Sequence, residues 1–117
     1  MSVRSFKVDN AASANDIQVA AAPGTNQVIR VINFVLVANG TVTVQFASGT
    51  AGAGGQTALT GPMQLAAGNP LQPGAVGSDF HGRATHFDSN VGEGLVLKFG
   101  GAVQVSGYVN YILAPQG

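Results

Sequence analysis

The sequence predicts an all-β protein, an antiparallel β-sandwich that is jelly-roll-like and has about eight strands. Short runs of β-branched and aromatic residues alternate along the chain with clusters of Gly, Pro, Asn and Ser. Several of these runs show the two-residue apolar period of half-buried strands. The best helix candidate, residues 11–22, is interrupted by Asn15 and Asp16 and ends at a Pro23-Gly24 turn.

Nine short segments have the strand pattern, and clusters of turn residues separate them. In chain order they are residues 3–8, 16–21, 27–38, 41–47, 62–66, 75–80, 84–87, 94–99 and 102–113. This number of short strands is typical of a sandwich or a jelly roll. At 117 residues the chain fits one domain, expected to span residues 1–117.

The composition excludes several functions. The chain has no cysteine, which excludes a disulfide framework, a thiolate zinc site and a cysteine nucleophile. Its five cationic side chains form no cluster, so we expect no nucleic-acid partner. No apolar run approaches the roughly 20 residues that span a bilayer, and the first ten residues have no apolar signal core. We therefore expect neither a membrane partner nor Sec secretion.

Charged residues make up 9% of the chain and the formal net charge is zero. A soluble domain carries roughly 25% charged residues, and net charge is what keeps protein surfaces from associating. The composition therefore favours a subunit that works inside an assembly.

The clearest turn signal is Asn39-Gly40, because a type I′ turn needs positive φ at both central residues. A two-residue turn here predicts a hairpin that pairs residue 38 with residue 41. The face expected in the core carries Val35, Val37, Val42, Val44 and Phe46. The opposite face carries Ile32, Phe34 and Leu36, so either a loop or another subunit must cover it.

The last predicted strand, residues 102–113, also has two faces of different character. Val105, Val109 and Leu113 lie on one face, and a mixed face carries Tyr108 and Asn110. This mixed face either meets a partner, since Tyr is enriched at interfaces, or is an ordinary half-exposed surface. Gly107 marks a bulge or a close backbone approach. The residues predicted to mediate self-association are Ile32, Phe34, Leu36, Tyr108, Asn110 and Ile112.

Two further segments are candidate sites. Residues 48–61 are uncharged and Gly-rich, which indicates either a mobile loop or a contact surface. The segment 79–88 holds both histidines, and a turn at residues 83–84 would gather two imidazoles and two carboxylates as metal ligands. A turn at Gly82-Arg83 suits the sequence better and staggers them. The four candidate ligands are Asp79, His81, His86 and Asp88; we expect no metal and no cofactor.

Catalysis is not expected either. Ser78 and Ser106 have no nucleophile-elbow context, and the five acidic residues include no evident pair of the kind that glycosidases use. The prediction is that the protein is not an enzyme.

The C-terminal third resembles the ending of small virion proteins of tailed bacteriophages. The resemblance covers residues 60–113 and depends on the run GEGLVLKF at residues 92–99 and on VQVSGYVNY at residues 103–111. Its most specific parts are the Ser106-Gly107-Tyr108 step and Tyr111. It implies a jelly-roll or tumour-necrosis-factor-like sandwich that is not an enzyme and commonly forms trimers.

The resemblance leads to two functional hypotheses. In the first, the chain is a capsid decoration or cement protein, made in the bacterial cytoplasm and located on the virion, which binds the major capsid protein as a homotrimer. Residues 1–10 would then be an arm whose Arg4, Phe6 and Lys7 contact the capsid; its removal should leave the trimer intact. In the alternative, the chain is a host-recognition or carbohydrate-binding module whose binding end is formed by residues 48–61 and 81–88.

Overall fold

The computed structural model describes residues 3–72 and 87–115, and within them it contains nine strands and no helix. The prediction of an all-β fold is therefore confirmed. The strands are β1 (Arg4–Asn10), β2 (Ile17–Ala20), β3 (Gln27–Ala38), β4 (Val42–Ser48), β5 (Thr57–Ala58), β6 (Met63–Leu65), β7 (Phe87–Asp88), β8 (Leu95–Phe99) and β9 (Val105–Pro115). The strands predicted at 75–80 and over most of 84–87 lie outside the described residues.

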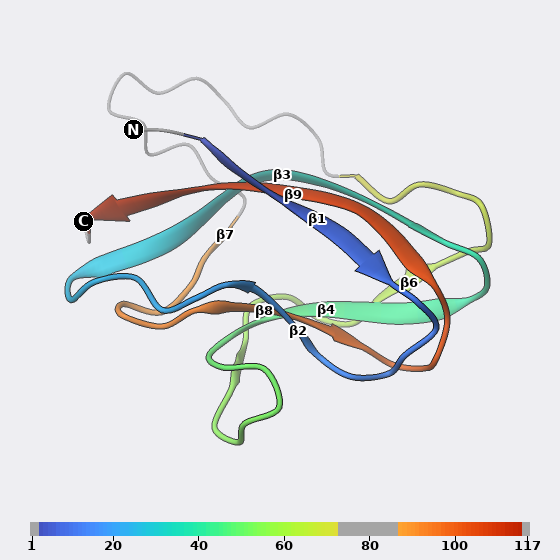
Figure 1. Ribbon diagram of the computed structural model, residues 1–117, viewed down its shortest axis with the longest axis horizontal. Coiled ribbons are helices and arrows are strands. Elements are labelled where there is room, and N and C mark those ends of the chain that lie inside the picture. The colour runs from blue at the N-terminus through green and yellow to red at the C-terminus, as the bar shows by residue number, and fades with distance from the viewer. Residues whose placement is uncertain (1–2, 73–86, 116–117) are drawn as a thin grey trace.

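The strands form two antiparallel sheets that pack face to face (Figure 1). The first sheet has the order β1-β9-β3-β7, and the second has the order β2-β8-β4-β5, with β6 also pairing with β4. β9 and β3, the two longest strands, pair in the middle of the first sheet. The architecture is the predicted sandwich.

The strand order is that of a jelly roll. The first strand pairs with the last, β2 pairs with β8, β3 pairs with β7, and β4 pairs with β5 and β6. These nested pairs are those of one long hairpin. The hairpin is rolled up because β9 also pairs with β3 and β8 also pairs with β4. Each sheet thus receives two of the four nested pairs, as in double-sheet jelly rolls.

The core lies between the two sheets and is centred on the side chain of Phe46. This residue is fully buried on β4, and its ring lies 5.1 Å from that of Phe34 and 5.0 Å from that of Phe87. Both contacts join the second sheet to the first, and such tilted aromatic pairs add stability beyond the area that they bury.

The predicted hairpin at Asn39-Gly40 is wrong. The flanking strands β3 and β4 lie in different sheets, so residue 38 does not pair with residue 41. β3 pairs with β9, whereas Val42 on β4 pairs with Leu65 of β6. The N–H of Asn39 donates to the carbonyl of Gln104. The Asn-Gly step is thus a corner between the sheets, and its flexible backbone suits such a corner as well as a hairpin.

The faces predicted for β3 are also wrong, for a second reason. Between Val31 and Asn33 the pairing with β9 shifts by one residue, as in a β-bulge. An extra residue moves every later side chain to the opposite face of the sheet. Phe34 and Leu36 therefore lie in the core, while Val35 and Val37 are half-buried.

Candidate functional site

The outer face of the first sheet, the face away from the core, presents three strands in register. Lys7, Tyr108 and Val35 form its central row across β1, β9 and β3. Two parallel rows flank the central one, with the members Ser5, Asn110, Asn33, Asp9, Ser106 and Val37. We call these nine residues the outer patch. Its surface is mostly uncharged, and it offers both apolar and hydrogen-bonding groups.

Tyr108 lies in the middle of the outer patch. Its side chain is 41% exposed, one of the large hydrophobic residues that remain exposed in the described part of the chain. Next to it, the amide of Asn110 donates a 2.7 Å hydrogen bond to the side-chain oxygen of Asn33. This bond joins two polar side chains of neighbouring strands on the same face as Tyr108.

Of the six residues predicted for self-association, three are buried. Phe34 and Leu36 belong to the hydrophobic core, 5% and 0% exposed, because the bulge in β3 turns them inward. Ile112 lies on the outer side of the sheet but is only 6% exposed, in a small cluster with Val28 and Ala114. Ile32 is half-buried at the bulge.

The residues predicted for the capsid-contact arm lie in the sheet. Arg4–Asn10 form β1, which pairs with β9 over seven residues, so this part of the predicted arm is an edge strand. Phe6 packs against the core, while Arg4 and Lys7 are exposed. The expectation that residues 1–10 form a separable arm is therefore corrected for residues 4–10.

Of the four candidate metal ligands, the described residues include Asp88, which forms an ion pair. Both oxygens of Asp88 meet the guanidinium of Arg30, with Nε–Oδ1 and Nη2–Oδ2 distances of 3.2 Å. Arg30 is buried, 6% exposed, and this bidentate pair with Asp88 compensates its charge. Asp79, His81 and His86 lie outside the described residues. Within the described ranges no three His, Asp or Glu side chains gather as metal ligands.

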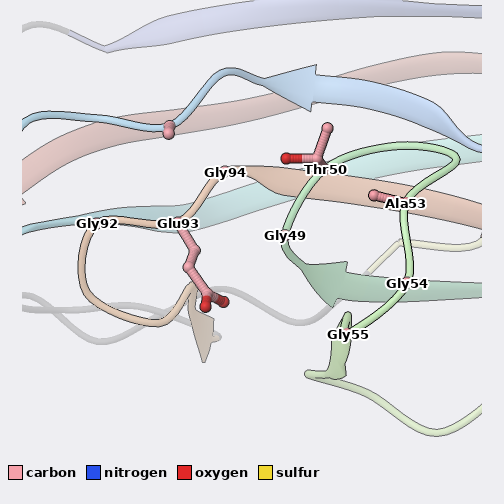
Figure 2. Close-up of a pocket in the computed structure, with 9 residues that line it drawn as sticks. Gly49, Thr50, Ala53, Gly54, Gly55, Gly92, Glu93 and Gly94 are labelled. Carbon is pink, nitrogen blue, oxygen red and sulfur yellow. The ribbon is translucent and has the colours of Figure 1, made fainter.

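A cavity of about 240 Å³ lies at one end of the sandwich, between the loop after β4 and the turn before β8 (Figure 2). Small residues form most of its wall, and the other lining side chains are Thr50 and Glu93. The small residues are Ala22, Gly49, Ala53, Gly54, Gly55, Gly92 and Gly94. The wall is therefore largely backbone, with one carboxylate and one hydroxyl.

Glu93 is the residue of this cavity that the sequence analysis missed. Its Oε1 accepts a hydrogen bond of 2.7 Å from the Ser48 hydroxyl and one of 3.2 Å from the Asn90 amide. Ser48 is fully buried and also receives the N–H of Asn90. The available signal was an acid between two glycines, Gly92-Glu93-Gly94, which by itself indicates only a turn.

The loop that carries Gly49–Gly55 is anchored by Gln18 of β2. The Gln18 Oε1 accepts the N–H of Ala51 at 2.8 Å. Its Nε2 lies within hydrogen-bond distance of three carbonyls, those of Ala20, Gly49 and Leu95. Gly94 allows this approach, since a Cβ there would lie 2.6 Å from the Nε2. One side chain thus joins β2, β8 and the loop.

A second set of polar contacts holds the far side of the loop. Gln56 donates to the carbonyl of Thr50 at 2.6 Å and to Asp16 at 3.2 Å. Lys98 donates to the Gln56 side-chain oxygen at 2.7 Å, and its Nζ lies 4.0 Å from Asp16. The loop within residues 48–61 is thus tied to the sheet at several points, and its role as a contact surface stays a prediction.

Replacement of Gln18 by Leu should loosen this loop. The change keeps a similar volume but leaves the Ala51 N–H and the carbonyls around it without their partner. Unsatisfied polar groups of this kind cost about 1–3 kcal/mol. We expect a lower urea midpoint and faster hydrogen exchange at Ala51. Gln64→Leu is the control, because Gln64 is exposed on β6; equal effects of the two changes would contradict the anchoring role.

Comparisons with known proteins do not show a family for this chain. No protein-family model matches the chain, and no curated protein matches it. A chain from a structure of infectious bursal disease virus, Gx strain, matches with 12% sequence identity and a TM-score of 0.41. The match covers 100% of this chain and 33% of the other, so this chain spans about a third of the protein that it matches. In the described ranges no helix is long and apolar enough to cross a membrane.

Proposed function

We propose that the chain is a non-enzymatic structural subunit of a bacteriophage virion, a decoration or cement protein that binds the major capsid protein as a homotrimer and stabilises the head. The observation that carries the proposal is the outer patch. It is a face of three paired strands on which Lys7 and Asp9 are the charged residues, and Tyr108 is exposed at its centre. Subunits that function in assemblies need such a face.

The chemistry of the outer patch suits contact with further copies of the chain. Tyr contributes a large area at low entropic cost and is enriched at interfaces. Val35 and Val37 add apolar area beside it, and Lys7 and Asp9 place opposite charges on the same strand. A stable interface needs at least about 1,000 Å² of total buried area, which is the size that the contact between copies must reach.

Contact with the capsid is assigned to the free edge of β1. This strand is the outermost of its sheet, so one side of its backbone has no partner strand among residues 3–72 and 87–115. The exposed Arg4 lies along it, whereas Lys7 belongs to the outer patch and Phe6 packs against the core, so both are withdrawn from the capsid contact. Many copies on a lattice then bind firmly through avidity even when each contact is weak.

The trimer is tested by the change Tyr108→Glu, which places a charge in the middle of the outer patch. Val91→Glu is the matched control, because Val91 is 42% exposed and lies in the turn before β8. Light scattering at several concentrations should give three times 11.7 kDa for the natural chain and the control, and 11.7 kDa for Tyr108→Glu. A natural chain that stays at 11.7 kDa at every concentration would contradict the trimer.

The decoration role is tested separately, with phage heads that lack the protein. Purified protein mixed with such heads should sediment with them, and the decorated heads should resist heating better than bare ones. Arg4→Glu should weaken this binding and leave the solution mass unchanged. Failure of the natural protein to sediment with heads would exclude the decoration role, whatever its oligomeric state.

The alternative function, a host-recognition or carbohydrate-binding module, is favoured by one specific observation. The cavity at Glu93 lies at the end of the sandwich where loops meet, formed in part by the segment 48–61 that the sequence pointed to.

A further inference from the structure

We infer that the cavity between Gly49–Gly55 and the Gly92–Gly94 turn binds one neutral sugar residue through its hydroxyl groups. The inference goes beyond the structural role, because it adds a ligand site to a subunit whose assembly uses a different surface. Figure 2 shows Glu93 on one side of the cavity and the backbone of Gly49, Gly54 and Gly55 on the other. A ligand between them would touch both.

The Glu93 carboxylate supplies an oriented acceptor. Its Oε1 already accepts hydrogen bonds from Ser48 and Asn90, which fix the direction of the side chain. Within the described residues its Oε2 makes no hydrogen bond to the protein, so this oxygen remains available. Hydrogen bonds from a hydroxyl to a carboxylate are roughly twice as strong as those between neutral groups. A sugar hydroxyl is a suitable donor.

The opposite wall supplies donors. In the described part of the chain, the N–H groups of Gly54 and Gly55 donate no hydrogen bond within the protein. The Thr50 hydroxyl also lines the cavity and can both donate and accept. The glycines leave the backbone uncovered, so a ligand can reach these N–H groups closely. The cavity thus has an acceptor on one wall and donors on the facing wall. This arrangement matches sugar hydroxyls, because each hydroxyl can both donate and accept a hydrogen bond.

The charge and the size of the cavity select among ligand classes. Glu93 is the one charged residue in the lining, so phosphates, sulfates and acidic sugars are disfavoured. The volume of about 240 Å³ is below the roughly 300–1,000 Å³ of sites for drug-sized ligands. A cavity of this volume suits a single sugar ring.

The loop is also held in place before a ligand arrives. Gln18 binds it at Ala51 and Gly49, and Gln56 binds it at Thr50. A site that is ordered in advance loses less conformational entropy on binding. The anchoring contacts therefore serve recognition as well as stability.

The experiment starts with a glycan array probed with the natural chain and with Gly54→Leu. A Cβ at Gly54 meets no atom within 4 Å, and the residue has no positive φ, so the fold accepts a side chain at this wall of the cavity. Gly61→Leu is the matched control, because Gly61 has equally open space outside the cavity. We expect neutral sugars to bind the natural chain and the control, and not Gly54→Leu.

The same sugar is then titrated against Glu93→Gln by calorimetry. Loss of the charged acceptor should weaken binding by about tenfold or more, with the urea midpoint checked to confirm folding. The inference is overturned if the array shows no bound neutral sugar, or if Gly54→Leu binds as well as the natural chain. Neither result bears on the trimer, because the proposed contact between copies lies on the outer patch and not at the cavity. The solution mass tests that contact separately.

Discussion

Replacement of Gly107 by Val is expected to lower the free energy of unfolding by about 3 kcal/mol or more. Gly107 has a φ of +144°, a conformation that residues with a Cβ rarely adopt. It lies in β9, opposite Leu36 of β3 and Val8 of β1, and a Cβ there would run into the carbonyl of Val35. The clash is with backbone in the longest strand pair, so no side-chain rotation relieves it.

The measurement is urea unfolding of the purified chain, with Gly101→Ala as the control. At Gly101 the nearest atom to a new Cβ is Val42 Cγ2 at 3.9 Å, and φ is not positive. Such a change should shift stability by at most about 0.5 kcal/mol. Equal midpoints for Gly107→Val and the natural chain would show that the backbone of β9 relaxes at this position.

Gly107 also shows how much of the fold the sequence could predict. A glycine inside a clear strand pattern indicated a bulge or a close approach, and the structure confirms a close approach to β3. The alternation in the last strand was likewise predicted correctly, with Val105, Val109 and Leu113 toward the core. These features depend on neighbours within one strand, which a two-residue period reveals directly.

Features that depend on a second strand could not be predicted in the same way. An Asn-Gly step permits a hairpin, but it forms a corner here because the two flanking strands pair elsewhere. β3 pairs with β9 and β4 pairs with β6, and the sequence around the step shows neither partner. The bulge near Asn33 leaves no mark in the sequence of β3, yet it decides that Phe34 packs inside. The self-association prediction failed at Phe34 and Leu36 for this reason.

The cavity was predictable only in part. The Gly-rich segment was recognised as unusual, which located one wall. Glu93 was not recognised, because Ser48, which orients it together with Asn90 of the same turn, lies far away in the sequence at the end of β4. Their meeting is a property of the rolled topology, which brings the end of β4 beside the start of β8.

Deletion of residues 1–10 is expected to prevent stable folding of the chain. The deletion removes all of β1 and with it the seven-residue pairing to β9. It also removes Val8 from the core, where a fully buried Val contributes about 1.5–3 kcal/mol, together with the packing of Phe6. Since a domain has a total stability of about 5–15 kcal/mol, this loss and the newly exposed edge of β9 should produce an aggregating protein.

The matched control is deletion of residues 1–3, which leaves β1 complete from Arg4. Circular dichroism and light scattering on both proteins distinguish the two possible roles of the N-terminus. A folded trimer without residues 1–10 would mean that the segment is dispensable for the sandwich and acts as an arm. Loss of folding in the longer deletion alone would mean that capsid contact by this strand must be tested with Arg4→Glu, because truncation removes the domain along with the contact.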